Sequence, residues 1–159
     1  MEARFSRSVL EALAALAHSA PAREVCGLLT GRGDAVTGHI AAANVAADPA
    51  TRFEIDPATL LAALKAERGG GETVVGCYHS HPSDDPAPSE RDAADAAPDG
   101  KLWLIIGRTK VGLWRAVADG GRFGRFEPVA WSVMTPSGLR DGPAFSKRPG
   151  EPHIRSLDA

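Results

Sequence analysis

The chain has few cysteines, no excess of basic residues and no long apolar run, and each lack excludes a class of protein. Cys26 and Cys77 are the only cysteines among 159 residues, which excludes a disulfide framework and favours a reducing, cytoplasmic environment. The formal net charge of −2 predicts no nucleic-acid partner. No stretch approaches the roughly 20 apolar residues that a membrane span requires, so no membrane association is expected.

The N-terminal segment is similar to a secretory signal only superficially. Arg4 and Arg7 precede the apolar stretch VLEALAALA, but Glu11 interrupts it, and its apolar residues have the spacing of an amphipathic helix. Ser8 and Glu11 match a capping box, and Pro21 is a helix stop. We therefore expect a helix of the folded domain that starts at Ser8 and ends before Pro21.

The remaining apolar patterns predict an α+β domain followed by a tail. The expected elements are strands at 24–31 and 35–46, a strand at 72–78, a short helix at 89–97, and strands at 101–107 and 111–117. A further helix is expected after Asp56, which can cap it, with Leu60, Leu61 and Leu64 on one face. This order predicts one domain over residues 1–130, with a mixed, mostly antiparallel sheet flanked by helices. Four prolines and little apolar periodicity predict a proline-rich tail over residues 131–159.

Two of the five histidines stand one residue apart at the end of an apolar strand. Successive side chains of a strand point to opposite faces, so His79 and His81 would project to the same side and could share one ion. Asp92 is the best candidate for a third ligand, because the proline-rich loop between them can fold back beside the strand end. Two imidazoles, one carboxylate and a water describe a catalytic zinc site with one open position.

Each of these residues also has a structural interpretation. The histidine pair could mark an exposed strand end, and Ser89 could cap the following helix with Asp92 as its reciprocal partner. The cap and the metal role are compatible, since a fixed helix start would hold the carboxylate near the histidines. Cys77 would share the histidine face and could be a rival ligand, although packing in the core is favoured.

The segment HSHPSDDPAPSERD at residues 79–92 resembles, at every position, the H-x-H-P, six residues, S-x-x-D pattern of the JAMM (MPN+) zinc metalloproteases. In that family a glutamate just before a strand similar to EVCGLL completes the site, and Glu24 matches it. The segment NVAADPATRFEIDP also resembles the family's run of an asparagine, a phenylalanine and an acidic residue before the second helix. The resemblance covers residues 5 to 128 and implies the JAMM/MPN core, which is cytidine-deaminase-like.

The resemblance implies a zinc-dependent hydrolase of peptide or isopeptide bonds. It implies that His79, His81 and Asp92 bind Zn²⁺. It further implies that Glu24 accepts the proton of the attacking water and delivers it to the leaving amine, and that Ser89 donates a hydrogen bond to the oxyanion.

The resemblance also implies the partner. Small stand-alone members that resemble this chain occur in bacteria, so the expected substrate is a ubiquitin-like or sulfur-carrier protein with a C-terminal Gly-Gly, whose tail could pair with a strand edge near the zinc. Family members often pair through their helices, which leaves a homodimer open. Two other classes stay open: a non-catalytic scaffold, and a zinc hydrolase acting on small molecules or nucleobases, which usually carries a C-x-x-C motif that the chain lacks.

Overall fold

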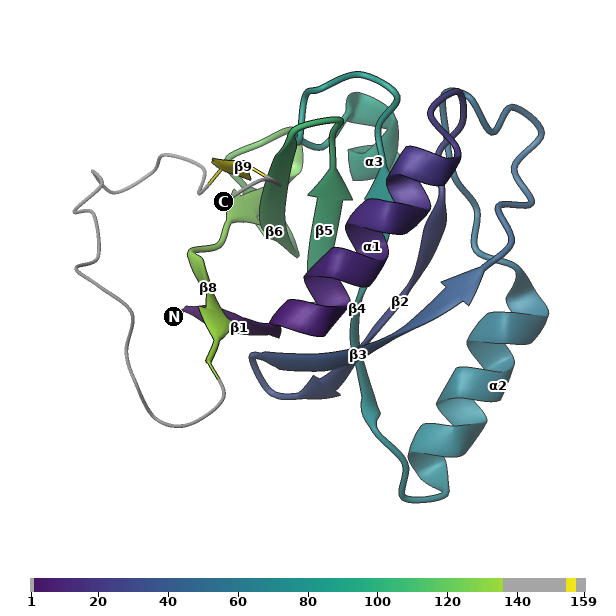
Figure 1. Cartoon of the computed structure of the whole chain (residues 1–159), viewed down its shortest axis with the longest axis vertical. Coiled ribbons are helices and arrows are strands. Elements are labelled where there is room, and N and C mark those ends of the chain that lie inside the picture. The colour runs from purple at the N-terminus through teal and green to yellow at the C-terminus, as the bar shows by residue number, and fades with distance from the viewer. Residues whose placement is uncertain (1, 136–153, 157–159) are drawn as a thin grey trace.

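The computed structural model of the protein describes residues 2–135 and 154–156 (Figure 1). The helices of these residues are α1 (Arg7–Ser19), α2 (Pro57–Arg68) and α3 (Glu90–Asp95). The strands are β1 (Ala3–Ser6), β2 (Cys26–Arg32), β3 (Ala35–Ala42), β4 (Thr73–Ser80), β5 (Leu102–Ile106), β6 (Lys110–Gly120), β7 (Gly124–Pro128), β8 (Trp131–Met134) and β9 (Ile154–Ser156). None of these helices is long and apolar enough to cross a membrane.

The strands form one mixed sheet. Its order is β7-β6-β5-β4-β2-β3-β1-β8, and β9 pairs with β6. The pairs β1·β3, β1·β8 and β4·β5 are parallel, whereas β2·β3, β2·β4, β5·β6, β6·β7 and β6·β9 are antiparallel. The fold class predicted from the sequence, an α+β domain with a mixed, mostly antiparallel sheet flanked by helices, is therefore confirmed.

Helix α1 covers one face of the sheet and buries the apolar stripe that its sequence predicts (Figure 1). Val9, Leu13 and Ala17 are its buried residues, at the three-to-four spacing of one helix face. The predicted capping box is wrong, because Ser8 lies inside the helix. Ser6 occupies the N-cap position, and its hydroxyl lies 2.7 Å from that of Ser8 without capping the backbone.

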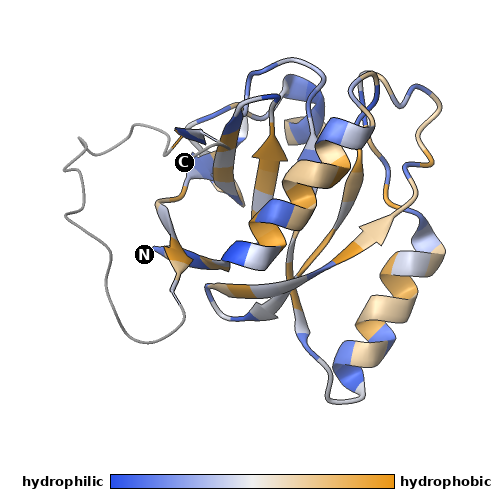
Figure 2. Cartoon of the chain, viewed as in Figure 1, coloured by the Kyte–Doolittle hydropathy of each residue, from blue (hydrophilic) through white to orange (hydrophobic). Residues whose placement is uncertain are grey.

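Strands β4 and β5 form the centre of the sheet. All five residues of β5 are buried, and the strand is hydrophobic along its length (Figure 2). On β4, Tyr78 belongs to the core cluster that also contains the α1 residues, whereas Cys77 packs in a second cluster with residues of α3. Alternation along β4 therefore points His79 and His81 away from α1, toward the face that α3 covers.

Helix α2 begins as the sequence predicts but buries a different side. Asp56 caps it, accepting a hydrogen bond from the backbone N–H of Ala58 at 3.4 Å. Ala63 is the one buried residue of the helix, while Leu60 and Leu61 are 36% and 62% exposed. The small Ala63 side chain lets the helix lie close to the sheet. Leu60 and Leu61 face outward, whereas Leu64 is partly buried against the cluster that contains Ala63.

The strands β1 and β8 do not follow from the sequence patterns above. They pair in parallel, and Trp131 is buried against Phe5 with ring centroids 5.7 Å apart. The first four residues of the predicted tail are therefore part of the sheet, and Ile154–Ser156 form β9. Residues 136–153 and 157–159 of that predicted tail lie outside the described residues.

Gly76 lies where β4 and β5 approach too closely for any side chain. A Cβ there would overlap the carbonyl oxygen of Leu102. We expect Gly76→Ala to lower the free energy of unfolding by about 2 to 3 kcal/mol, because the strands must separate to admit a methyl group. Urea denaturation would measure this loss. Gly121→Ala, with open space around its position, is the control, and equal losses in both variants would contradict the interpretation.

Candidate metal centre

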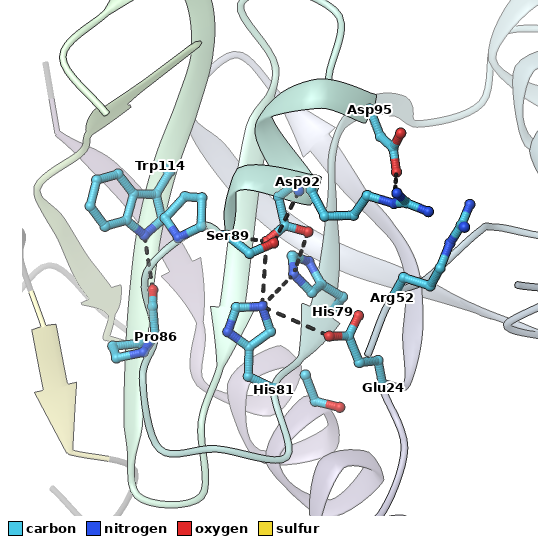
Figure 3. A network of polar contacts seen from close by, with 12 residues as sticks. Glu24, Arg52, His79, His81, Pro86, Ser89, Asp92, Asp95 and Trp114 are labelled. Carbon is cyan, nitrogen blue, oxygen red and sulfur yellow. Dashed lines mark hydrogen bonds and ion pairs between the residues drawn. The ribbon is translucent and has the colours of Figure 1, made fainter. Parts of the chain in front are cut away.

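The candidate site lies where the end of β4 meets the start of β2 (Figure 3). Ser80, between the two histidines, exchanges two hydrogen bonds with Val25. Its N–H donates to the Val25 carbonyl at 2.9 Å, and its hydroxyl accepts from the Val25 N–H at 2.9 Å. This exchange holds Glu24, the residue before Val25, beside the histidines.

Three of the predicted site residues converge on one point. His79, His81 and Asp92 each offer one ligand atom, and these atoms all lie within 4.8 Å of one another. The two Nε2 atoms are 3.1 Å apart, and they lie 3.3 and 3.4 Å from the two carboxylate oxygens of Asp92. Glu24 stands next to this group, with its Oε1 4.0 Å from His81 Nε2.

The donor set suits a divalent metal ion. The Nδ1–H of His81 is assigned as the donor to the Asp85 carbonyl at 2.9 Å, which leaves the Nε2 lone pair of the neutral ring free for a metal. Two imidazole lone pairs and a carboxylate that face the same point are better satisfied by a shared cation than by one another. Two nitrogens and one oxygen are typical ligands of a metal site with an open position.

Aromatic rings fix the orientation of His79. Phe53 stacks on its imidazole with centroids 4.3 Å apart and planes 19° apart, and Trp103 meets its edge at 5.8 Å. The histidine is completely buried. Phe53 belongs to the segment that resembles the family, but only the structure shows its contact with His79.

Ser89 and Asp92 form the predicted cap of α3. The Ser89 hydroxyl accepts from the Asp92 N–H at 3.0 Å, and Asp92 Oδ2 accepts from the Ser89 N–H at 2.7 Å. The cap and the convergence on the histidines therefore occur together. Because the Ser89 oxygen acts as an acceptor in the cap, its hydroxyl hydrogen stays available to another acceptor.

The loop between His81 and Ser89 is held by hydrogen bonds from side chains on or beside β6, which the sequence patterns did not identify. The hydrogen bonds run from Thr109 Oγ1 to Asp84 Oδ2 at 2.6 Å, from Trp114 Nε1 to the Pro86 carbonyl at 2.9 Å, and from Arg122 Nε to the Pro88 carbonyl at 2.7 Å. These partners lie on or beside β6, so no local sequence pattern could have identified them. They hold the loop in the shape that brings Asp92 back to the histidines.

Asn44 supports Glu24 from the opposite side. Its amide nitrogen donates to the carbonyls of Glu24 at 2.9 Å and Arg52 at 3.0 Å. Its amide oxygen accepts from the N–H groups of Ala46 at 3.0 Å and Glu54 at 3.1 Å. One side chain thus joins the Glu24 backbone to the loop between β3 and α2.

The electrostatic environment separates the roles of the two carboxyl groups. The pKa of Glu24 is raised to about 7, mainly by burial, while the charge of His81 lowers it and the charges of Asp92 and Asp48 raise it. Burial would also raise the pKa of Asp92, but hydrogen bonds from His79 and His81 hold that pKa well below its usual range. Asp92 is therefore a permanent anion, whereas Glu24 can gain or lose a proton near neutral pH.

The two histidines also differ in the direction of their pKa shifts. Burial lowers the pKa of His79, which favours the neutral ring that a metal ligand must have. Burial also acts to lower the pKa of His81, but the Asp92 hydrogen bond and the Asp85 carbonyl outweigh it and raise the pKa overall. Cys77, the rival ligand, packs in the core cluster on this face and does not belong to the group of convergent ligand atoms.

The fold and this group of residues define an α+β domain with a candidate metal centre at a strand end. Residues 6–118 match the family of prokaryotic homologs of the JAB domain, and the chain belongs to that family. Among solved structures, a protein from Desulfitobacterium hafniense is similar with a TM-score of 0.69 and 26% identity, covering 84% of this chain and 93% of that one. A JAB1/MPN domain protein from Archaeoglobus fulgidus, with a TM-score of 0.52 and 22% identity over 82% and 98% of the chains, supports the fold.

Two curated relatives have names that describe an activity. A desampylase of Haloferax volcanii is 44% identical over 87 residues, which cover 54% of this chain and 63% of the relative. A probable TtuB-protein conjugate cleaving protease of Thermus thermophilus is 41% identical over 86 residues, which cover 54% and 57%. The matched part of the chain thus spans about three fifths of the length of these relatives.

The Trp114 hydrogen bond to Pro86 should control the order of the loop between His81 and Ser89. We expect Trp114→Phe to speed hydrogen exchange of the Ala87 and Ser89 amides about tenfold, since a lost buried hydrogen bond weakens the loop by about 1 kcal/mol or more. Exchange measured by NMR or mass spectrometry would test this. Trp103→Phe, the same change in the same core cluster, is the control. Equal acceleration in both variants would mean that the loop responds to core packing alone.

Proposed function

We propose that the chain is a zinc-dependent peptidase or isopeptidase that hydrolyses an amide bond after the C-terminal Gly-Gly of a ubiquitin-like or sulfur-carrier protein. The observation that carries the proposal is the convergence of two imidazoles and one carboxylate beside a buried glutamate. The names of the two matched relatives, a desampylase and a conjugate-cleaving protease, support the class of substrate. A cytoplasmic location and a homodimer stay predictions from the sequence.

His79, His81 and Asp92 are the proposed zinc ligands. Nε2 of each histidine faces the shared point, together with the carboxylate of Asp92. When bound there, zinc would supply a lowered pKa for a water molecule and polarisation of the substrate carbonyl.

Glu24 is the proposed proton carrier. Its carboxyl group lies beside the ligand group but is farther from the histidine nitrogens than Asp92 is, at 4.0 Å from His81 Nε2. A pKa raised to about 7 by burial lets it accept the proton of the attacking water and then release it to the leaving amine. The Asn44 hydrogen bond to its carbonyl holds the backbone in place for this transfer.

Ser89 is the proposed donor to the oxyanion that develops on the substrate carbonyl. Its backbone N–H and its hydroxyl oxygen are both engaged in the cap of α3, which fixes the position of the side chain. The hydroxyl hydrogen is the remaining donor. A donor held in advance of the reaction stabilises the developing charge without reorganisation.

The Glu24→Gln variant tests the proton carrier apart from the metal. The substrate is a ubiquitin-like protein extended beyond its Gly-Gly, and mass spectrometry follows cleavage after the second glycine. We expect zinc-loaded wild type to cleave it, and Glu24→Gln to lose at least about 1000-fold in rate while retaining one zinc per chain, because a glutamine cannot accept a proton.

The exposed carboxylate of Glu54, on the loop between β3 and α2, provides the control, and Glu54→Gln should keep most of the activity. Stable binding of the ubiquitin-like protein by zinc-loaded wild type, without turnover across a broad panel of substrates, would contradict the proposal and support a non-catalytic scaffold.

Ser89 allows the oxyanion role to be separated from the helix cap. We expect Ser89→Ala to lower kcat about 100-fold to 1000-fold, the usual effect of removing one oxyanion donor. Ser89→Thr keeps the hydroxyl and the cap, and should retain most of kcat. Circular dichroism and zinc content would show that α3 and the metal site persist in both variants. If the two variants had the same kcat, the hydroxyl would have no role in the reaction.

A further inference from the structure

A cavity with two arginines lies beside the proposed zinc site. It has a volume of about 330 Å³ and is lined by Asp48, Thr51, Arg52 and Arg91. The first three belong to the loop between β3 and α2, and Arg91 belongs to the first turn of α3. Figure 3 shows the Arg52 side chain beside Glu24, extending toward the level of Asp95 on α3. The cavity therefore joins the loop that supports Glu24 to the helix that carries Asp92.

The guanidinium group of Arg52 has a hydrogen-bond donor that is available to a ligand. Its Nε is buried and has no hydrogen-bond partner within residues 2–135 and 154–156. A buried charged donor without a partner is costly, and such groups are uncommon in folded proteins. The nearby Asp48 accepts from Thr51 Oγ1 at 2.7 Å and makes no hydrogen bond with Arg52 Nε.

The ion pair that Arg91 makes with Asp95 is weak. Its Nε lies 3.6 Å from Asp95 Oδ2 in an i,i+4 pair, and both side chains are about half exposed, at 49% and 52%. Exposed pairs of this kind contribute little, so a ligand can compete for the guanidinium. Two guanidinium groups face one carboxylate in the lining of the cavity, which leaves a net positive charge. A planar carboxylate fits this arrangement, because guanidinium groups bind it with two parallel hydrogen bonds.

The position of Glu24 indicates which part of a substrate would supply the carboxylate. The Asn44 amide binds the carbonyls of both Glu24 and Arg52, so the proton carrier and the cavity share one support. Glu24 delivers its proton to the leaving amine in the proposed reaction. The leaving group therefore lies on the Glu24 side of the site, which is also the side of Arg52.

Resting on the proposed function, we propose that Arg52 and Arg91 bind the free carboxylate of the leaving group. The substrate class is then a Gly-Gly tail extended by one amino acid or a very short peptide with a free C-terminus. Water adds its oxygen to the glycine carbonyl carbon, the C–N bond breaks, and the proton held by Glu24 goes to the departing amine. The arginines neutralise and orient the carboxylate of the amino acid that leaves.

Binding to an inactive variant tests the subsite without turnover. Zinc-loaded Glu24→Gln protein is titrated by calorimetry with N-acetyl-Gly-Gly-Ala as the free acid and as the C-terminal amide. We expect the acid to bind at least about tenfold more tightly, which corresponds to about 1.4 kcal/mol. Adding Arg52→Gln should remove most of this preference, and Arg52→Lys should restore part of it.

Arg108→Gln is the matched control. Arg108 lines a separate cavity of about 180 Å³ that shares no lining residue with the first, so the same loss of charge there should leave the preference for the acid unchanged. Equal binding of acid and amide would overturn the proposal. So would a preference that survives Arg52→Gln combined with Arg91→Gln, because the carboxylate would then be bound by the zinc.

A third peptide identifies the side of the carboxylate. N-acetyl-Asp-Gly-Gly-Ala amide carries its acid before the glycines, and a gain in affinity from that aspartate that requires Arg52 would overturn the assignment to the leaving group. Cleavage by zinc-loaded wild type, measured separately, tests the proposed function. Failure of that cleavage is thereby distinguished from failure of the subsite, which appears only as a lost preference for the acid in binding.

Discussion

The site depends on the pairing of β2 with β4 at the ends where Val25 and Ser80 exchange hydrogen bonds. Ser80 stands between the two histidines, and alternation turns its side chain toward the opposite face of the strand. That hydroxyl accepts the Val25 N–H and so sets the position of Glu24. Ser80, which is neither a proposed metal ligand nor the proposed proton carrier, therefore sets the distance between Glu24 and the histidines.

The second constraint is electrostatic. Four ionisable side chains meet in a buried space where each charge is costly unless another balances it. Asp92 is stabilised as an anion by both histidines. Glu24 lies next to the same group, but its contact there, at 4.0 Å from His81, is too long for a hydrogen bond. The difference in pKa between the two carboxyl groups follows from this asymmetry, and it supports the proposed roles of Asp92 as a metal ligand and Glu24 as a proton carrier.

Local patterns predicted the parts of the site that a single segment contains. Alternation placed His79 and His81 on one face, and the S-x-x-D spacing predicted the cap that the structure shows. Glu24 could be selected only through the family resemblance, because its proximity to His81 arises from strand pairing across more than 50 residues. The same limit explains why Trp114 and the parallel strands β1 and β8 were not predicted: their partners are distant in sequence. The prediction for α2 was wrong for Leu60 and Leu61 for another reason: the small Ala63 side chain determined which side of the helix approaches the sheet.

The reciprocal cap of α3 has a consequence for how a cation would enter. One oxygen of Asp92 already accepts a hydrogen bond from the backbone of its own helix, so this side chain loses its rotational freedom when the chain folds and not when an ion arrives. The ring of His79 is held in the same manner by the stacked ring of Phe53 and the edge contact with Trp103. A cation that binds there meets side chains that are already ordered, so little conformational entropy remains to be lost on binding.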